Sequence, residues 1–119
     1  MLTVELLRDG MSVTGFRVRG HAGWDEWGKD VVCAGVSAAC HMALVGLADV
    51  LGEAVDLEKG NGYMMVRVPV HAAALPEVKA ILRAFELEIQ AIERSYPGNV
   101  EFVDPAARTG RAANRQVSR

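Results

Sequence analysis

The chain has 119 residues, half of them apolar, and a formal net charge of −2. This length suits one domain, and the apolar fraction excludes a disordered chain and predicts a folded core. We see no uninterrupted apolar run of about 18 residues, so we expect no membrane-spanning helix and no membrane partner.

The charges divide the chain into a body, residues 1–103, and a tail, residues 104–119. The body carries nine basic and fourteen acidic residues, whereas the tail carries four arginines and one aspartate. An acidic body argues against direct nucleic-acid binding by the body and would suit a basic peptide, although so small an imbalance is also common on a surface with no partner. We expect a single domain over 1–103 and a disordered basic tail over 104–119.

Two features indicate the cellular compartment. The chain has only two cysteines, which favours a reducing environment over a secreted disulfide scaffold. Its first residues, Met1 to Glu5, are strand-like and acidic, unlike the basic start of a secretory signal. We therefore expect a cytoplasmic protein.

The first half of the chain predicts a hairpin followed by a helix. Apolar residues alternate over residues 2–7 and again around Phe16 and Val18, with Asp9-Gly10 suited to the tight turn between them. The second strand ends at Gly20. A helix is then predicted from Asp30, as its N-cap, to Gly52. Its apolar face has spacings of three and four and consists of Val36, Cys40, Leu44, Leu47 and Leu51.

The second half repeats this pattern. Residues 55–58 and 64–68 predict two strands joined by a glycine-rich turn. Pro76 suits the first turn of a long helix, whose apolar stripe ends at Tyr96, and residues 100–103 predict a short edge strand. The order ββαββα plus a terminal strand predicts a two-layer α+β fold, with an antiparallel sheet and both helices on one face.

This order of elements brings His21, at the end of the second strand, close to Cys33, near the start of the first helix. The positive end of the helix macrodipole favours the thiolate form of a cysteine there. A histidine within reach could pair with the thiolate and later donate a proton, as in Cys–His covalent catalysis, while free first-turn N–H groups could hold an oxyanion. Cys33 could instead be a small core residue, the commoner fate of a cysteine and the one we expect for Cys40.

Other residues around this pair are candidates for supporting roles. Gly20 and Gly23 let the backbone turn sharply and leave room for a substrate chain. Asp30 could cap the helix, orient His21, or do both. Ser37 could hydrogen-bond the carbonyl four residues back or line the floor of the site.

The loop before the helix carries two tryptophans. Trp24 and Trp27 could form an aromatic flap over a bound peptide, or one of them could anchor the loop on the body. His41 and His71 have no partner at catalytic spacing, so we expect them to be surface or boundary residues. Cys33, Cys40, His21 and His41 contain the right atoms for zinc, but the two cysteines stand seven residues apart without a CxxC pair, so we expect no metal site.

A resemblance to a known family rests on three pieces of sequence: Gly20-His21-Ala22-Gly23, then Gly28-Lys29-Asp30-Val31-Val32-Cys33-Ala34, then Ser37. Together they resemble the signature of the bacterial ribosomal-processing cysteine proteases (Prp), and a looser similarity extends over about residues 1–103. The resemblance implies a homodimeric, cofactor-free cysteine endopeptidase with His21 and Cys33 as catalytic residues. An acidic residue at the position of Asp30 and the serine at Ser37 also match the family.

The resemblance further implies a substrate. Relatives remove an N-terminal extension from the large-subunit ribosomal protein numbered twenty-seven during ribosome maturation, cutting after an aromatic residue and ahead of a small residue and a basic run. Two alternatives stay open: a non-enzymatic ribosome-assembly or interaction module with the same fold, and a thiol hydrolase or transferase of another substrate. An interaction module has no need of a reactive thiol, so the His21 and Cys33 pair discriminates against it.

Overall fold

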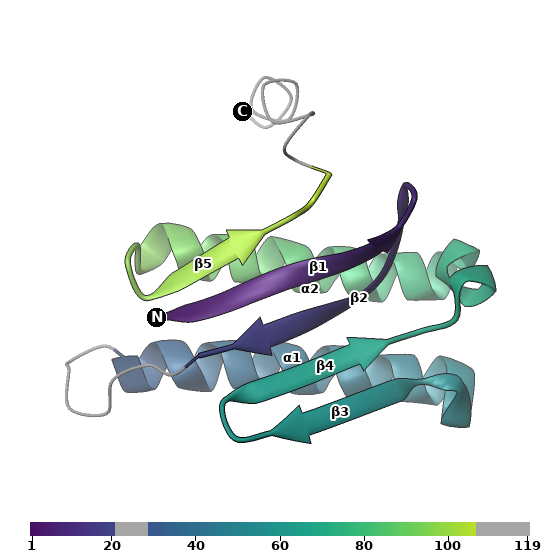
Figure 1. Ribbon diagram of the computed structural model, residues 1–119, viewed down its shortest axis with the longest axis horizontal. Helices are drawn as coiled ribbons and strands as arrows, with labels where there is room; N and C mark the ends of the chain where they lie inside the picture. The colour runs from purple at the N-terminus through teal and green to yellow at the C-terminus, as the bar shows by residue number, and fades with distance from the viewer. Residues whose placement is uncertain (21–28, 107–119) are drawn as a thin grey trace.

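The structure is a computed structural model that describes residues 1–20 and 29–106, with side chains for 1–20 and 31–106. Over these residues the chain forms one five-stranded sheet and two long helices (Figure 1). In chain order they are β1 (Leu2–Asp9), β2 (Ser12–Arg19), α1 (Lys29–Leu51), β3 (Asp56–Gly60), β4 (Tyr63–Arg67), α2 (Pro76–Ser95) and β5 (Val100–Val103). Short 3-10 helices, η1 (Gly52–Ala54) and η2 (Val70–Ala74), follow α1 and β4.

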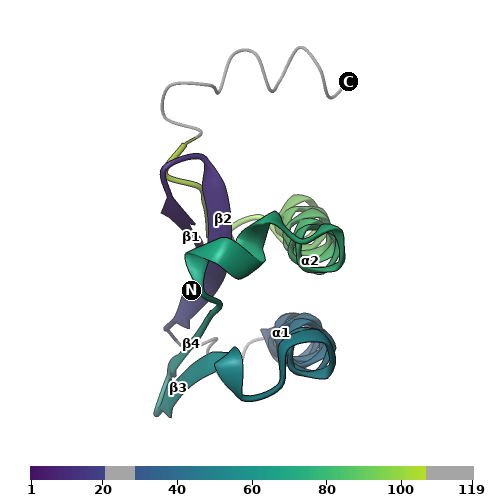
Figure 2. The same cartoon turned by 90° about the vertical axis from the view of Figure 1, so that its right-hand side faces the viewer.

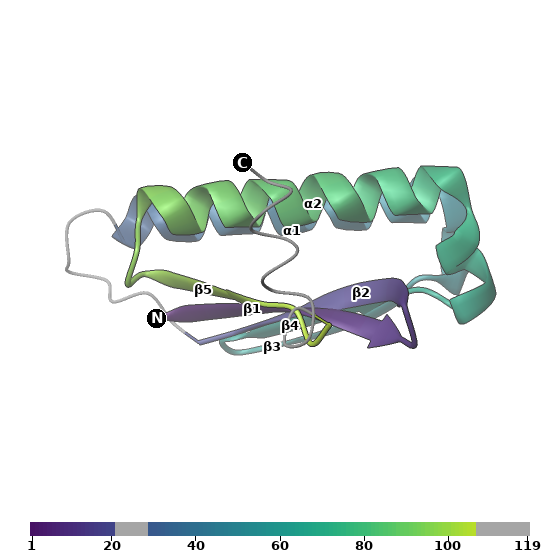
Figure 3. The same cartoon turned by 90° about the horizontal axis from the view of Figure 1, so that it is seen from above.

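The sheet has the strand order β3-β4-β2-β1-β5, and both helices cover the same face of it (Figures 2 and 3). The predicted α+β class and two-layer arrangement are confirmed. The sheet is mixed rather than wholly antiparallel, because β5 pairs with β1 in parallel. The reason is that α2 carries the chain back to the end of the sheet where β1 starts, so β5 sets out beside Leu2, whose N–H donates to the Asn99 carbonyl at 3.0 Å.

The core lies between the sheet and the helix layer. Phe16 of β2 stacks on Phe85 of α2, with ring centroids 4.0 Å apart. The two helices approach closely because α1 presents glycine to α2: a Cβ added to Gly46 would lie 3.2 Å from the Ile81 side chain. The predicted apolar faces of both helices are confirmed as the faces that pack inward. Residues that are almost completely buried include Val4, Leu6, Phe16, Val32, Leu47, Val66, Val78, Phe85 and Ile89.

Helix α1 is more apolar than expected. Residues 31–48 contain no Asp, Glu, Lys or Arg, and an 18-residue window of Val31–Ala54 has a mean hydropathy of 2.0, which is apolar enough to cross a membrane by length and composition alone. The expectation that no such segment exists was therefore wrong. The core helix of a globular domain passes the same test, and α1 packs on the sheet and on α2, so its apolarity is a weak indication of a membrane.

The last strand is held in place by two polar contacts. Arg8 donates from Nε and Nη2 to the two Asp104 carboxylate oxygens at 2.7 and 2.8 Å. Glu93 of α2 accepts a hydrogen bond from the Phe102 N–H at 3.0 Å. The hydrogen bonds from Arg8 hold the pKa of Asp104 below its usual value. Asp104, the first residue of the expected tail, is thus bonded to the sheet.

Candidate active site

Cys33 lies near the N-terminal end of α1. The helix begins at Lys29, so Asp30 is its second residue rather than the residue before it, and Cys33 is the fifth residue rather than part of the first three. With Asp30 as N-cap the predicted helix would begin at Val31, so the predicted start was two residues late, and the Asp30 side chain lies outside the described side chains. Because Cβ atoms lean toward the N-terminus of a helix, the Cys33 side chain leans toward the turn of residues 29–32, whose N–H groups have no acceptor within the helix.

Gly20 fixes the end of strand β2 beside this helix. Its φ of 105° is a conformation that residues with a side chain rarely adopt, and a Cβ there would lie 2.4 Å from the Met1 carbonyl oxygen. The Gly20 N–H also donates to the Gly62 carbonyl at 3.0 Å, which ties β2 to the turn between β3 and β4. The sharp backbone conformation predicted for Gly20 is present, and close approach of the chain requires it.

Gly20 and Cys33 both line one cavity of about 430 Å³ between α1 and the sheet. The end of β2 and the start of α1 therefore meet, as the order of elements predicted, at one end of the molecule (Figure 1). The floor of the cavity is apolar and consists of Leu2, Val18, Val36, Cys40, Leu44 and Met64. Gly62 and Tyr63 complete the side formed by β4 and the turn before it.

Three polar side chains line the same cavity. Ser37 and His41 follow Cys33 at intervals of four residues, so all three share one face of α1. His41 was expected to be a surface or boundary residue without a partner at catalytic spacing. It is exposed, but it belongs to the wall that Cys33 forms, and its spacing from Cys33 was the signal that could have shown this. Lys59 of β3, which was not among the predicted site residues, faces α1 across the cavity.

Cys40 lines the cavity from a deeper position than Cys33. Its side chain belongs to the core and only 3% of the residue is exposed, which confirms the prediction of a core cysteine. Burial raises the pKa of the Cys40 thiol to about 12, so this sulfur stays protonated near neutral pH. Cys33 is half-buried, so a substrate or reagent in the cavity can reach it.

Several predicted site residues fall in the segment between β2 and α1. His21, Gly23, Trp24, Trp27 and Gly28 lie outside the described residues. Their roles, and that of the Asp30 side chain, stay predictions. Within residues 1–20 and 29–106, no three side chains of His, Cys, Asp or Glu come together as a metal site would require.

A partly exposed cysteine near a helix N-terminus, at the edge of a cavity in a two-layer α+β domain, defines a candidate thiol-dependent hydrolase. Comparison with known proteins agrees with this class. The family model of the cysteine protease Prp matches residues 1–101, and the chain belongs to that family.

Individual relatives and structures support this membership. The ribosomal processing cysteine protease Prp of Staphylococcus aureus is 30% identical over 106 residues, covering 86% of this chain and 97% of the relative. The Bacillus subtilis protein of the same name is 27% identical over 92 residues, covering 74% and 82%. The crystal structure of the S. aureus protease with a covalently linked product peptide superposes with a TM-score of 0.74 at 28% identity, covering 87% of this chain and 99% of that one. A second structure, with a substrate peptide, gives a TM-score of 0.75 at 27% identity over the same shares of the two chains.

Proposed function

We propose that this protein is an endopeptidase that removes the N-terminal extension of the large-subunit ribosomal protein numbered twenty-seven during ribosome maturation. The observation that carries the proposal is the position of Cys33, half-buried at the edge of an apolar cavity and near the N-terminal end of α1. The S. aureus relative is a ribosomal processing protease whose structure holds a covalently linked product peptide, and a covalent link is what nucleophilic catalysis produces.

In the proposed mechanism Cys33 gives its thiol proton to His21, and its sulfur attacks the scissile carbonyl carbon to form a tetrahedral intermediate. N–H groups of residues 29–32 stabilise its oxyanion, a contribution of about 3 kcal/mol per donor in other proteases. His21 gives a proton to the leaving amine, and the acyl group stays on Cys33. Water that has lost a proton to His21 then releases the acyl group as a carboxylate, so no cofactor takes part.

Other residues have supporting roles in this proposal. Asp30 orients His21 or stabilises the first turn of α1, and Ser37 lies on the cavity wall one turn after Cys33. The segment that holds Trp24 and Trp27 covers the bound peptide. The acidic body suits the basic run of the substrate rather than direct contact with nucleic acid. The proposed reaction takes place in the cytoplasm.

A homodimer is part of the proposal, and the outward face of α1 supports it. Val31, Met42 and Val45 are 59%, 42% and 49% exposed, and no charge interrupts this face from Val31 to Ala48. An uncharged apolar stripe is complementary to itself across a two-fold axis, so a second copy of the chain suits it. Val45→Glu should yield a monomer by analytical ultracentrifugation. Leu87→Glu, at an equally exposed position on α2, should leave the dimer intact.

The cleavage assay uses a peptide that spans the extension and the start of the mature ribosomal protein. We expect two products by mass spectrometry from the wild type and none from Cys33→Ala or His21→Ala. Cys40→Ala is the matched control, because it removes a thiol from the same helix and cavity without touching the proposed nucleophile. Binding without cleavage by the wild type would indicate an interaction module instead. Cleavage by Cys33→Ala would contradict the mechanism.

A further inference from the structure

The cavity beside Cys33 has an unusual charge for this protein. The body carries more acidic than basic residues, yet Lys59 is the one formally charged side chain among the described residues that line the cavity. Lys59 makes no ion pair with any other described residue. Among the described side chains, therefore, no carboxylate neutralises its positive charge by a direct ion pair.

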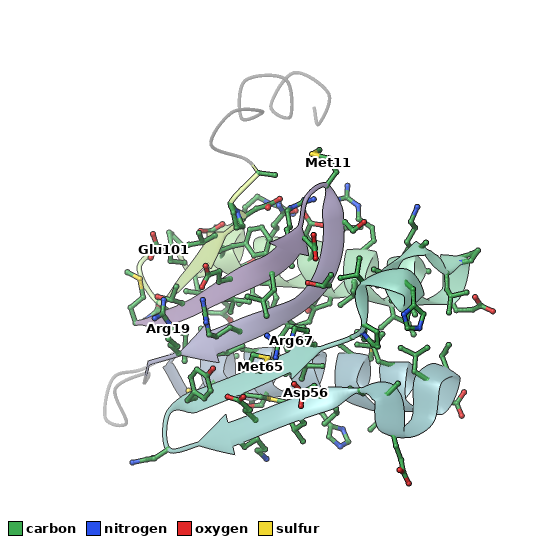
Figure 4. The ribbon with its side chains drawn as sticks, turned by 45° about the vertical axis from the view of Figure 1, so that its right-hand side comes forward. Met11, Arg19, Asp56, Met65, Arg67 and Glu101 are labelled. Atoms are coloured by element: carbon green, nitrogen blue, oxygen red, sulfur yellow. The ribbon has the colours of Figure 1, made fainter. Side chains whose placement is uncertain are left out.

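The strand register explains why the acidic neighbours of Lys59 do not compensate it. Lys59 pairs with Met64, and both lie on the side of the sheet that faces α1. Asp56 and Glu58 alternate with Lys59 along β3, so their side chains point to the opposite face. There Asp56 accepts a hydrogen bond from Arg67 at 3.1 Å (Figure 4). The strand thus turns its carboxylates away from the cavity and its ammonium toward it.

The substrate of the proposed protease must place a side chain near this ammonium. Cys33 lines the cavity, so the side chain that enters it belongs to a residue next to, or close to, the scissile bond. A lysine or arginine side chain would lose hydration against the apolar floor and would meet a like charge. An apolar side chain would be buried without penalty, and one with an anionic end would have Lys59 as its partner.

We propose that Lys59 determines specificity, so that the cavity accepts a substrate side chain that is apolar or ends in an anion and rejects lysine and arginine. This inference depends on the proposed endopeptidase function and makes it more specific. It separates two regions of the substrate: the side chain near the scissile bond enters the cavity, and any basic run lies on the acidic exterior.

The first test measures kcat/KM for peptides in which each residue within three positions of the cleaved bond is replaced by norleucine, lysine or glutamate. At one position, lysine should lower kcat/KM by about tenfold or more relative to norleucine, because the two side chains have similar length and differ in charge. In Lys59→Glu the peptide with lysine at that position should have a higher kcat/KM than the peptide with glutamate, the reverse of the wild-type order, and no other position should change. In Lys59→Met the difference in kcat/KM between these two peptides should shrink. Lys79→Glu, in the first turn of α2 and on the wall of a different cavity, should change the preference at no position. No change in preference in Lys59→Glu, or an equal change at every position, would overturn the proposal.

A second test needs no proteolysis, so it separates failure of this inference from failure of the proposed function. The rates at which Cys33 reacts with anionic sulfonatoethyl and cationic trimethylammonioethyl methanethiosulfonate report the charge of the cavity. We expect the ratio of anionic to cationic rate to fall by about tenfold in Lys59→Glu and to stay unchanged in Lys79→Glu. An unchanged ratio in a folded Lys59→Glu protein would overturn the inference. The expected ratio together with no cleavage of any peptide would count against the endopeptidase function alone.

Discussion

Cys33 and Cys40 line the same cavity from positions two turns apart on α1, yet only Cys33 is partly exposed, whereas Cys40 is a core residue. The two thiols should therefore react at very different rates. Near neutral pH iodoacetamide should modify Cys33 much faster, because Cys40 is inaccessible and its pKa is raised to about 12. Mass spectrometry of the two peptides measures both rates in one sample. His21→Ala should slow modification of Cys33 and leave Cys40 unchanged; equal rates at the two thiols in the native protein would contradict the assignment of Cys33.

The same pair should not form an internal disulfide. Seven residues along one helix correspond to a Cα separation of about 10 Å, well beyond the limit of about 7 Å for a disulfide. Mild oxidation of the folded protein should therefore not lower the mass of the monomer by two hydrogens. Trapping free thiols under denaturing conditions followed by intact-mass analysis measures this. An internal Cys33–Cys40 disulfide would require α1 to unwind in this region.

Gly20→Ala should distort the edge of the cavity. The new Cβ would lie 2.4 Å from the Met1 carbonyl oxygen at a φ of 105°, so we expect a loss of about 1–3 kcal/mol in the free energy of unfolding and slower cleavage. Gly60→Ala is the control, because that glycine ends β3 at the same end of the sheet and a Cβ there would contact nothing within 4 Å. Urea denaturation measures both variants. Equal stabilities of the two variants would show that the close approach at Gly20 has no energetic role.

Asp104→Asn should destabilise the protein in a pH-dependent way. The carboxylate accepts two hydrogen bonds from Arg8, and both side chains are largely buried, so we expect a loss of about 1–2 kcal/mol at neutral pH. Because the folded-state pKa of Asp104 is lowered, its contribution is complete above the unfolded pKa of about 3.9 and is lost as the pH falls through the folded pKa. The difference between wild type and variant should therefore shrink below about pH 4. Asp56→Asn, which breaks the exposed pair with Arg67, should change the unfolding midpoint little at any pH.

Truncation should separate the tail from the contact that Asp104 makes. A chain ending after Ala106 keeps the Arg8–Asp104 pair and the hydrogen bond from the Ala106 N–H to Asp104, so we expect wild-type stability and peptide cleavage. A chain ending after Val103 loses these contacts and should unfold at a lower urea concentration, like Asp104→Asn. Loss of peptide cleavage in the longer, folded truncation would show that residues 107–119 contribute to the reaction.

Local sequence patterns were sufficient for most of the secondary structure. The spacing of apolar residues along α1 and α2 identified the faces that pack inward, since burial on one side of a helix follows its 3.6-residue period. Asp9-Gly10, Gly52 and Pro76 marked the turn, the helix end and the helix start because each has a distinctive backbone preference. The family of the protein could also be identified from the sequence, because many of the residues around Gly20 and Cys33 match the family's motif.

Other features depended on contacts between distant segments, which no local pattern encodes. The direction of β5 was decided by where α2 returns the chain, and the bond between Arg8 and Asp104 exists only because β5 then lies beside β1. The roles of His41 and Lys59 as cavity residues likewise followed from packing α1 against the sheet. The sequence alone thus determined the elements, their buried faces and the candidate nucleophile, because these depend on residues close in the chain. The tertiary structure alone decided which side chains surround Cys33, because that depends on how β3, β4 and α1 come together.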